Sequence, residues 1–229
     1  YNTRHLVNRI TTTGSGNVLV KEQKYPSDFL SEPVYTTMVG KNMLDYQIEE
    51  TNYKNGGATV STKTSYRDWG ATSIKTHIIK PEFVSTKQGG GAYETRITFH
   101  SYDEVGNLLS VSKDGAKKIS YQYAHRLELP VAQANNATPG QIFYEGFEDA
   151  SRNSGEYDSK AGRKSRTGGY TRLLSNVPNG IYNLTYFQKA NGTWTPVTVP
   201  NIAVSNTSYT INLAGQVDEI RFCPREATM

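Results

Sequence analysis

Apolar or β-branched side chains alternate with polar ones in two stretches of the first half of the chain. The clearer stretch covers residues 92–99 (AYETRITF), and the pattern recurs in residues 118–123 (KISYQY). Successive side chains of a β-strand point to opposite faces, so a period of two predicts strands. One face of the first stretch is predicted to carry Tyr93, Thr95, Ile97 and Phe99.

Short glycine-containing spacers separate the runs that are rich in Thr, Val, Ile and Tyr. Glycine reaches positive φ without steric cost, which tight hairpin turns require. The spacing therefore predicts successive antiparallel hairpins along the first half of the chain. The spacers are residues 14–17, 55–57, 89–91, 106–107 and 114–115.

Residues 31–44 (SEPVYTTMVGKNML) interrupt the strand pattern. Pro33 stands near the start of this stretch, and Val34, Met38 and Val39 are spaced as on one side of a helix. A short helix and a loop with a single turn are both compatible with these residues.

The character of the chain changes near residues 130–142, where two prolines, Asn-Asn and Pro-Gly occur close together. We therefore predict two domains, 1–141 and 142–229. The second domain has its own strand-like runs, separated by turns at 178–180, 191–193 and 206–208. Many short strands at even spacing are typical of a compact two-sheet sandwich, so the whole chain is predicted to be all-β.

The composition agrees with a β-protein whose core contains aromatic rings. Hydrophobic residues make up 36% of the 229 residues, and 16 residues are Tyr. No apolar run approaches the roughly 20 residues that a membrane helix needs, so no membrane span is predicted. The chain opens within a strand-like run at Tyr1, and we therefore expect it to be a piece of a longer protein.

The basic residues favour a solvated surface over a nucleic-acid partner. The net charge is +4, but most Lys and Arg residues are spread singly along the chain. A phosphate-binding surface needs clustered charge, and only residues 160–166 (KAGRKSR) are clustered. Acidic polysaccharide is a second possible partner for this cluster.

The residue types that usually carry catalysis do not form a recognisable motif. Cys223 is the only cysteine, so an internal disulfide is excluded, and no two of the four His residues have metal-ligand spacing. There is no Gly-x-Ser-x-Gly elbow and no phosphate-binding loop motif. Spacing alone does not exclude a glycosidase pair of carboxylates, but nothing singles one out. The chain is expected not to be an enzyme.

Residues 102–115 (YDEVGNLLSVSKDG) resemble the YD repeat of RHS-like proteins. Residues 5–29 and 121–137 are similar to less regular segments of the same family, so the resemblance covers most of 1–140, although only 102–115 matches the motif cleanly. It implies an antiparallel sheet of stacked hairpins that bury their apolar faces against neighbouring repeats.

The repeat motif itself is expected to be structural. Gly106 and Gly115 permit turns, the Asp103 side chain can accept hydrogen bonds from neighbouring backbone N–H groups, and Tyr102 covers the hairpin stem.

Three stretches after residue 142 resemble the jelly-roll carbohydrate-binding modules found in such proteins: 143–149 (FYEGFED), 159–165 (SKAGRKS) and 217–222 (VDEIRF). The resemblance implies that the first and last strands pair. It also implies a structural Ca²⁺ bound by the carboxylates of Glu148 and Asp218 and by the backbone carbonyl at Lys160. The alternative is that these carboxylates only pair with surface bases such as Arg221.

Sugar recognition by such a module requires exposed flat rings. The candidates are Trp194, Tyr170, Tyr182, Tyr186 and Phe187. Alternation places Tyr182, Leu184 and Tyr186 on the predicted core face and Phe187 on the opposite face. Trp194 and Tyr170 are the predicted carbohydrate contacts. Trp194 lies beside a turn, where a Trp can also close the edge of a hydrophobic core.

These resemblances predict a non-catalytic structural fragment of a large RHS/YD-repeat protein. Such a protein is expected to be secreted or displayed on the cell surface, as an encapsulating or adhesive, toxin-associated scaffold. The expected partner is the rest of the parent repeat protein. The alternative is a module that recognises polysaccharide through its C-terminal β-sandwich, and an enzyme is the third reading.

Overall fold

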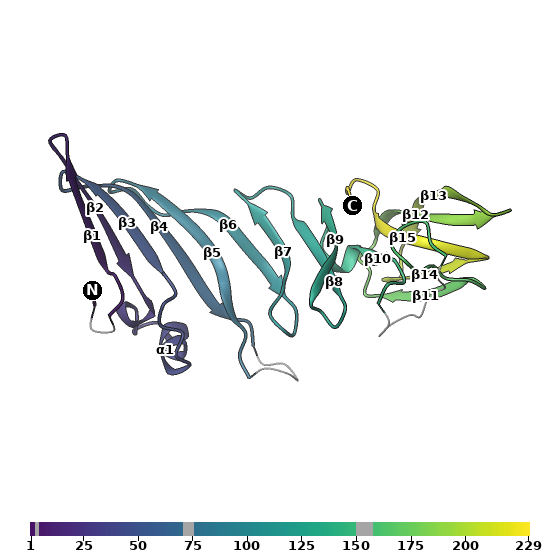
Figure 1. Cartoon of the computed structure of the whole chain (residues 1–229), viewed down its shortest axis with the longest axis horizontal. Helices are drawn as coiled ribbons and strands as arrows, with labels where there is room; N and C mark the ends of the chain where they lie inside the picture. The colour runs from purple at the N-terminus through teal and green to yellow at the C-terminus, as the bar shows by residue number, and fades with distance from the viewer. Residues whose placement is uncertain (3–4, 71–75, 150–157) are drawn as a thin grey trace. The chain divides into compact units, whose positions relative to one another are not determined.

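A computed structural model describes residues 1–2, 5–70, 76–149 and 158–229 of the chain (Figure 1). The described residues are predominantly β-strand with antiparallel pairing, which confirms the predicted all-β class. The chain divides into two compact units, Tyr1–Ala116 and Lys117–Met229.

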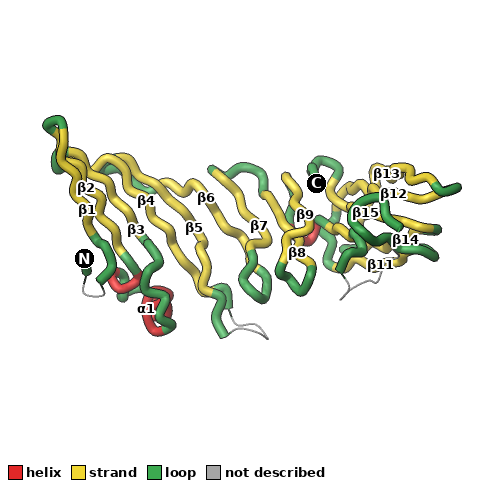
Figure 2. The backbone as a smooth tube through the Cα atoms, in the orientation of Figure 1, coloured by secondary structure: helices red, strands yellow, loops and turns green. Residues whose placement is uncertain are grey.

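In the first unit, the strands of the sheet are neighbours in sequence order, each antiparallel to the next (Figure 2). Short spacers favour pairing with the neighbour in sequence, and the two strands that flank the longer segment 25–48 pair as well. The strands are β1 (Arg9–Gly14), β2 (Asn17–Lys24), β3 (Glu49–Lys54), β4 (Gly57–Asp68), β5 (Ile79–Gln88), β6 (Glu94–Tyr102) and β7 (Leu108–Lys113).

The glycine-containing spacers form turns as predicted. Ser15 and Gly16 join β1 to β2 with φ of 50° and 76°, and Asn55 and Gly56 join β3 to β4 with φ of 50° and 83°. Two central residues at positive φ define the type I′ turn, which matches the right-handed twist of the flanking strands.

The predicted helical interruption is a helix, α1 (Pro33–Gly40), which follows the 3-10 turn η1 (Pro26–Asp28). Tyr35 and Met38 of α1 are fully buried and form a small core cluster with Ile48 and Ile79. Burial of this apolar side therefore stabilises α1 more than helix propensity does in a segment of eight residues.

A bulge changes the predicted faces of strand β6. Val84 of β5 pairs with Ile97, whereas the next residue, Ser85, pairs with Thr95. Arg96 is therefore an extra residue in β6, and Ile97 points to the opposite face from Thr95. The prediction that Tyr93, Thr95, Ile97 and Phe99 share one face was wrong, because an inserted residue reverses the alternation.

Apart from the α1 cluster, the sheet of the first unit buries mainly small hydroxyl residues. They are Thr51, Ser61, Ser110 and Ser112. At the β1–β2 hairpin, in contrast, Ile10 and Leu19 are 47% and 49% exposed. Within the described part of this unit, the sheet is thus a single layer with accessible apolar side chains near its edge.

The second unit starts with the hairpin β8 (Ile119–Ala124) and β9 (Leu129–Asn135), followed by the 3-10 turn η2 (Pro139–Gln141). Two further sheets follow, with strand orders β10-β15-β12-β13 and β11-β14. The strands are β10 (Phe143–Glu145), β11 (Tyr170–Ser175), β12 (Gly180–Ala190), β13 (Thr193–Val204), β14 (Ser208–Leu213) and β15 (Gln216–Pro224).

These two sheets enclose the main hydrophobic core. Tyr182 and Leu184 are 0% and 2% exposed, as their predicted position on the core face required. The Tyr182 ring stacks on Phe222 at 4.7 Å between centroids, and Tyr209 stacks on Phe222 at 5.1 Å. The first strand, β10, pairs with the last, β15, with Phe143 opposite Phe222. The arrangement is sandwich-like.

Hydrogen bonds tie the β8–β9 hairpin to the rest of the second unit. The Gln122 side chain donates to the Tyr144 carbonyl and accepts from the Tyr144 N–H, both at 2.8 Å. The His125 N–H donates to Asp149 Oδ2 at 2.7 Å. The compact unit therefore starts at Lys117, while the boundary at 141/142, drawn from a change in sequence character, stays a prediction.

Candidate functional site

The Tyr-Asp motif closes the turn between β6 and β7. Asp103 Oδ1 accepts the N–H groups of Val105, Gly106 and Asn107 at 3.0, 2.8 and 2.8 Å, and Oδ2 accepts the Asn107 side-chain amide at 2.9 Å. Gly106 has φ of 94°, which this turn requires. One carboxylate thus organises the whole turn.

Tyr102 covers the neighbouring strands. Its hydroxyl donates to the Pro81 carbonyl at 2.9 Å, and its ring contacts Trp69 at 5.2 Å between centroids. Burial raises the pKa of the hydroxyl. Gly115, the fourth residue of the predicted motif, lies in the turn after β7 with φ of 69°. All four residues have contacts or backbone angles typical of turn and stem positions.

Replacing Asp103 by alanine is expected to lower the free energy of unfolding of the first unit by about 2 kcal/mol, because three N–H groups lose their hydrogen bonds to the carboxylate. Asp103→Asn keeps one carbonyl oxygen and should lose less. The chain has two Trp residues, Trp69 in the first unit and Trp194 in the second. In a Trp194→Phe background, the fluorescence of Trp69 during urea unfolding therefore measures the first unit alone. Equal stability of Asp103→Ala and the parent would contradict the turn role.

In the second unit, Asp218 holds one end of the loop formed by residues 158–165. Its side chain is fully buried, and Oδ2 accepts the N–H groups of Lys160 at 2.8 Å and Ala161 at 3.1 Å. Oδ1 accepts the N–H of Glu219 at 2.8 Å. Burial raises the pKa of the Asp218 carboxyl above its ordinary value, although the N–H donors oppose this shift.

Glu148 holds the other end of the same loop. Its Oε1 accepts the N–H groups of Arg163 and Lys164, both at 2.6 Å. Gly162 lies between the two clasped segments with φ of 67°, and a methyl group added there would lie 2.5 Å from Glu148 Oε1. Close approach and positive φ together explain the glycine.

The structure thus brings Glu148, Asp218 and the backbone of Lys160 to one loop. Lys160 presents its N–H to Asp218, whereas the predicted Ca²⁺ site needs its carbonyl oxygen. Among the described residues, no three His, Cys, Asp or Glu side chains are arranged to hold a metal ion. A structural Ca²⁺ at this loop stays a prediction. Arg221, the alternative partner, forms its ion pair with Glu219 at 2.8 Å.

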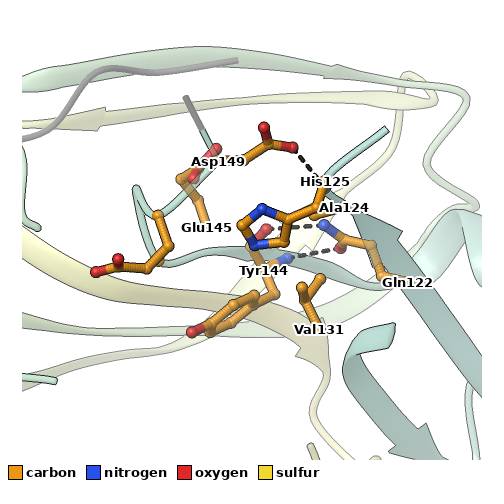
Figure 3. A pocket seen from close by; sticks show the side chains of 9 residues that line it. Gln122, Ala124, His125, Val131, Tyr144, Glu145 and Asp149 are labelled. Atoms are coloured by element: carbon orange, nitrogen blue, oxygen red, sulfur yellow. Dashed lines mark hydrogen bonds between the residues drawn. The ribbon is translucent and has the colours of Figure 1, made fainter. Parts of the chain in front are cut away.

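A cavity of about 170 Å³ lies between the β8–β9 hairpin and residues 144–149 (Figure 3). Its polar lining includes Gln122, His125, Tyr144 and Asp149, which also form the hydrogen bonds that join these segments. The Tyr144 hydroxyl donates to Glu219 at 2.6 Å, and burial together with this bond raises its pKa. The size suits ordered water or a small polar group.

The two predicted carbohydrate contacts differ in exposure. Tyr170 is 8% exposed and packs edge-to-face on Phe147 at 5.3 Å, so its ring belongs to the core and is not available to stack on a sugar. Trp194 is half-buried on β13, an edge strand of the four-stranded sheet, with Lys189 Nζ 5.7 Å from its ring centroid.

Two features of these sites were missed in the sequence. The Asn191–Gly192 turn pairs Lys189 with Trp194, and a two-residue turn of this composition could have predicted the pair. The links from Gln122 to Tyr144 and from His125 to Asp149 join residues more than 20 positions apart, and no local pattern indicates them.

Comparisons of this chain with protein-family models, with curated proteins and with solved structures give no match. Among the helices of the described residues, none has both the length and the hydrophobicity to cross a membrane. The interpretation of function therefore depends on the geometry of the two units.

Proposed function

We propose that this chain is a non-catalytic structural segment of a large secreted or surface-displayed repeat protein of the RHS/YD type, acting as an encapsulating or adhesive, toxin-associated scaffold. The observation that supports this most is the single-layer sheet of consecutive hairpin strands in the first unit. Such a sheet buries little apolar surface by itself, so further copies of the same unit or the rest of a parent chain would complete it.

The turn at Asp103 gives further support, because Tyr102 and Asp103 make contacts that organise a hairpin. Their polar atoms bond to the backbone of their own unit. A repeat motif that stacks hairpins needs these contacts.

Strand β1 provides the experiment. All six of its residues are exposed, and between Arg9 and Gly14 it has no charge, proline or bulge of the kind that usually protects an edge strand. We expect concentration-dependent self-association of the chain by sedimentation velocity. Ile10→Lys combined with Thr12→Lys should abolish it with an unchanged circular dichroism spectrum.

The matched control places the same charges elsewhere. Thr195→Lys with Thr198→Lys adds two lysines to exposed positions of β13 in the second unit. This variant should self-associate like the parent. A parent chain that stays monomeric at the highest concentrations, or equal loss in both variants, would contradict the role proposed for the β1 edge.

A second function is favoured by one observation on the sandwich. Phe187 and Trp194 lie beside the ammonium groups of Lys160 and Lys189 on the β12–β13 surface. Aromatic rings next to hydrogen-bonding groups suit sugar recognition, and polysaccharide binding is therefore our alternative proposal for the second unit.

A further inference from the structure

We propose that the β12–β13 surface binds a polysaccharide that carries uronic-acid carboxylates. This inference rests on the alternative function above and specifies its ligand class and its site. We define the uronate face as Phe187 and Lys189 of β12, Trp194 and Pro196 of β13, and Lys160 of the clasped loop.

Strand register places the first four of these residues on one face. Phe187 pairs with Pro196 and Lys189 pairs with Trp194, and directly paired residues of antiparallel strands point to the same side. Leu184 of β12 is in the core, so residues an odd number of positions away on this regular stretch point outward. β13 is an edge strand, so this sheet has no further strand next to Trp194. A long ligand can therefore extend past Trp194 without meeting the sheet.

Each ring on this face has an ammonium group beside it. Lys160 Nζ lies 5.4 Å from the Phe187 centroid, and Lys189 Nζ lies 5.7 Å from the Trp194 centroid. Both distances are within the roughly 6 Å range of cation–π contacts. A uronic acid has the complementary chemistry, with an apolar ring face for stacking and a carboxylate for the ammonium group.

The clasped loop fixes one of these cations. Phe187 pairs with Asp218 across β12 and β15, and Asp218 bonds the N–H of Lys160, so the buried carboxylate anchors the loop directly beside the Phe187 ring. Asp158 at the start of the loop bonds Lys189, and this contact lowers the pKa of the Asp158 carboxyl. An acidic ligand would take the place of Asp158 at Lys189.

The surroundings of the face are positively charged. Residues 160–166 contain four basic residues and no acidic one, and Lys160, Arg163 and Arg166 are exposed. Among the described residues, the exposed Asp158 bonds Lys189 of the face, while Asp218 is buried and bonds the N–H of Lys160. This excess of positive charge favours an anionic glycan over a neutral one, because it raises the local concentration of the ligand.

Affinity electrophoresis of the full chain tests the proposal with two ligands that share one backbone. Polygalacturonate carries a carboxylate on each sugar, and its methyl ester carries none. Dextran sulfate is the third ligand, and it tests whether sulfate provides the anion instead. We expect retention by polygalacturonate and at least about tenfold weaker retention by the methyl ester.

Three variants separate this face from general charge effects. Trp194→Ala and Lys160→Gln should each weaken polygalacturonate binding about tenfold, and Trp194→Phe should recover most of the binding because it restores a ring. Lys41→Gln is the matched control, since it removes the same charge from an exposed position of the first unit. It should bind like the parent, and unchanged melting temperatures verify folding.

The outcomes are distinct. Equal binding of the methyl ester and polygalacturonate would overturn the uronate proposal and leave polysaccharide recognition intact. Stronger binding of dextran sulfate would assign the face to sulfated glycans and overturn the carboxylate ligand. Equal losses in Lys160→Gln and Lys41→Gln would show that net charge, and not this face, drives retention. Binding to none of the three ligands would overturn this inference.

Discussion

Tyr182→Ala should destabilise the second unit by about 3–5 kcal/mol. The Tyr182 side chain is fully buried, and its ring stacks parallel to Phe222 at an interplanar angle of 4°. Removing the ring loses this burial and leaves a cavity between the two sheets, because packed neighbours relax only partly.

Tyr182→Phe is the matched control for this substitution. It keeps the ring and removes only the hydroxyl, which donates to the Pro178 carbonyl at 2.6 Å, so the expected loss is about 1 kcal/mol. Urea unfolding followed by Trp194 fluorescence in a Trp69→Phe background measures the second unit. Similar losses in the two variants would mean that the ring itself contributes little to the core.

The second large effect is expected at Asp218. Asp218→Ala removes the acceptor of three N–H groups at a fully buried position, and we expect a loss on the order of 3 kcal/mol. Asp218→Asn retains the size and one carbonyl oxygen and should cost less than Asp218→Ala. The same urea experiment measures both variants.

The pH dependence of this effect follows from the raised pKa of the Asp218 carboxyl. Burial is the main cause, and the nearby Glu219 adds to the shift. Between the ordinary value of 3.8 and the raised value, the folded state binds more protons than the unfolded state. The contribution of this group to stability is therefore greatest below pH 3.8 and is lost as the pH rises through the folded-state pKa.

Asp218→Asn should remove this dependence. The stability of the parent relative to Asp218→Asn is expected to fall from pH 3.5 to pH 6 (about the range of a shifted carboxyl). A stability difference that rises with pH would contradict the raised pKa of Asp218.

Thermal unfolding of both proteins with and without roughly 1–10 mM CaCl₂ tests the calcium prediction. A higher melting temperature of the parent, absent in Asp218→Asn, would show that calcium binds and that Asp218 takes part.

Local chemistry made much of the fold predictable. The Asn55–Gly56 and Asn191–Gly192 turns depend on two residues each, and such turns fix which strands pair and in which register. The core face of β12 followed from the alternation of Tyr182 and Leu184. The face of β6 was predicted wrongly, because the bulge at Arg96 depends on the partner strand β5 and not on the sequence of β6.

The candidate sites were less predictable because they depend on contacts between distant segments. Glu148 and Asp218 were expected to face the loop at Lys160, and they do, but the sequence does not tell whether a backbone N–H or a carbonyl faces them. Tyr170 was expected at the surface, yet it lies against Phe147 from a segment 23 positions earlier. Exposure of a ring depends on such packing, which strand alternation alone does not specify.

The small hydroxyl residues that occupy buried positions of the first sheet affect how this unit responds to temperature. Thr51 and Ser61 bond each other at 2.9 Å where most sheets place Val or Ile. The heat capacity of unfolding comes mainly from apolar surface that becomes exposed to water, and averages about 12–15 cal/mol/K per residue in globular proteins. The heat capacity of unfolding of the first unit should be lower than this average. Its free energy of unfolding should therefore change little with temperature.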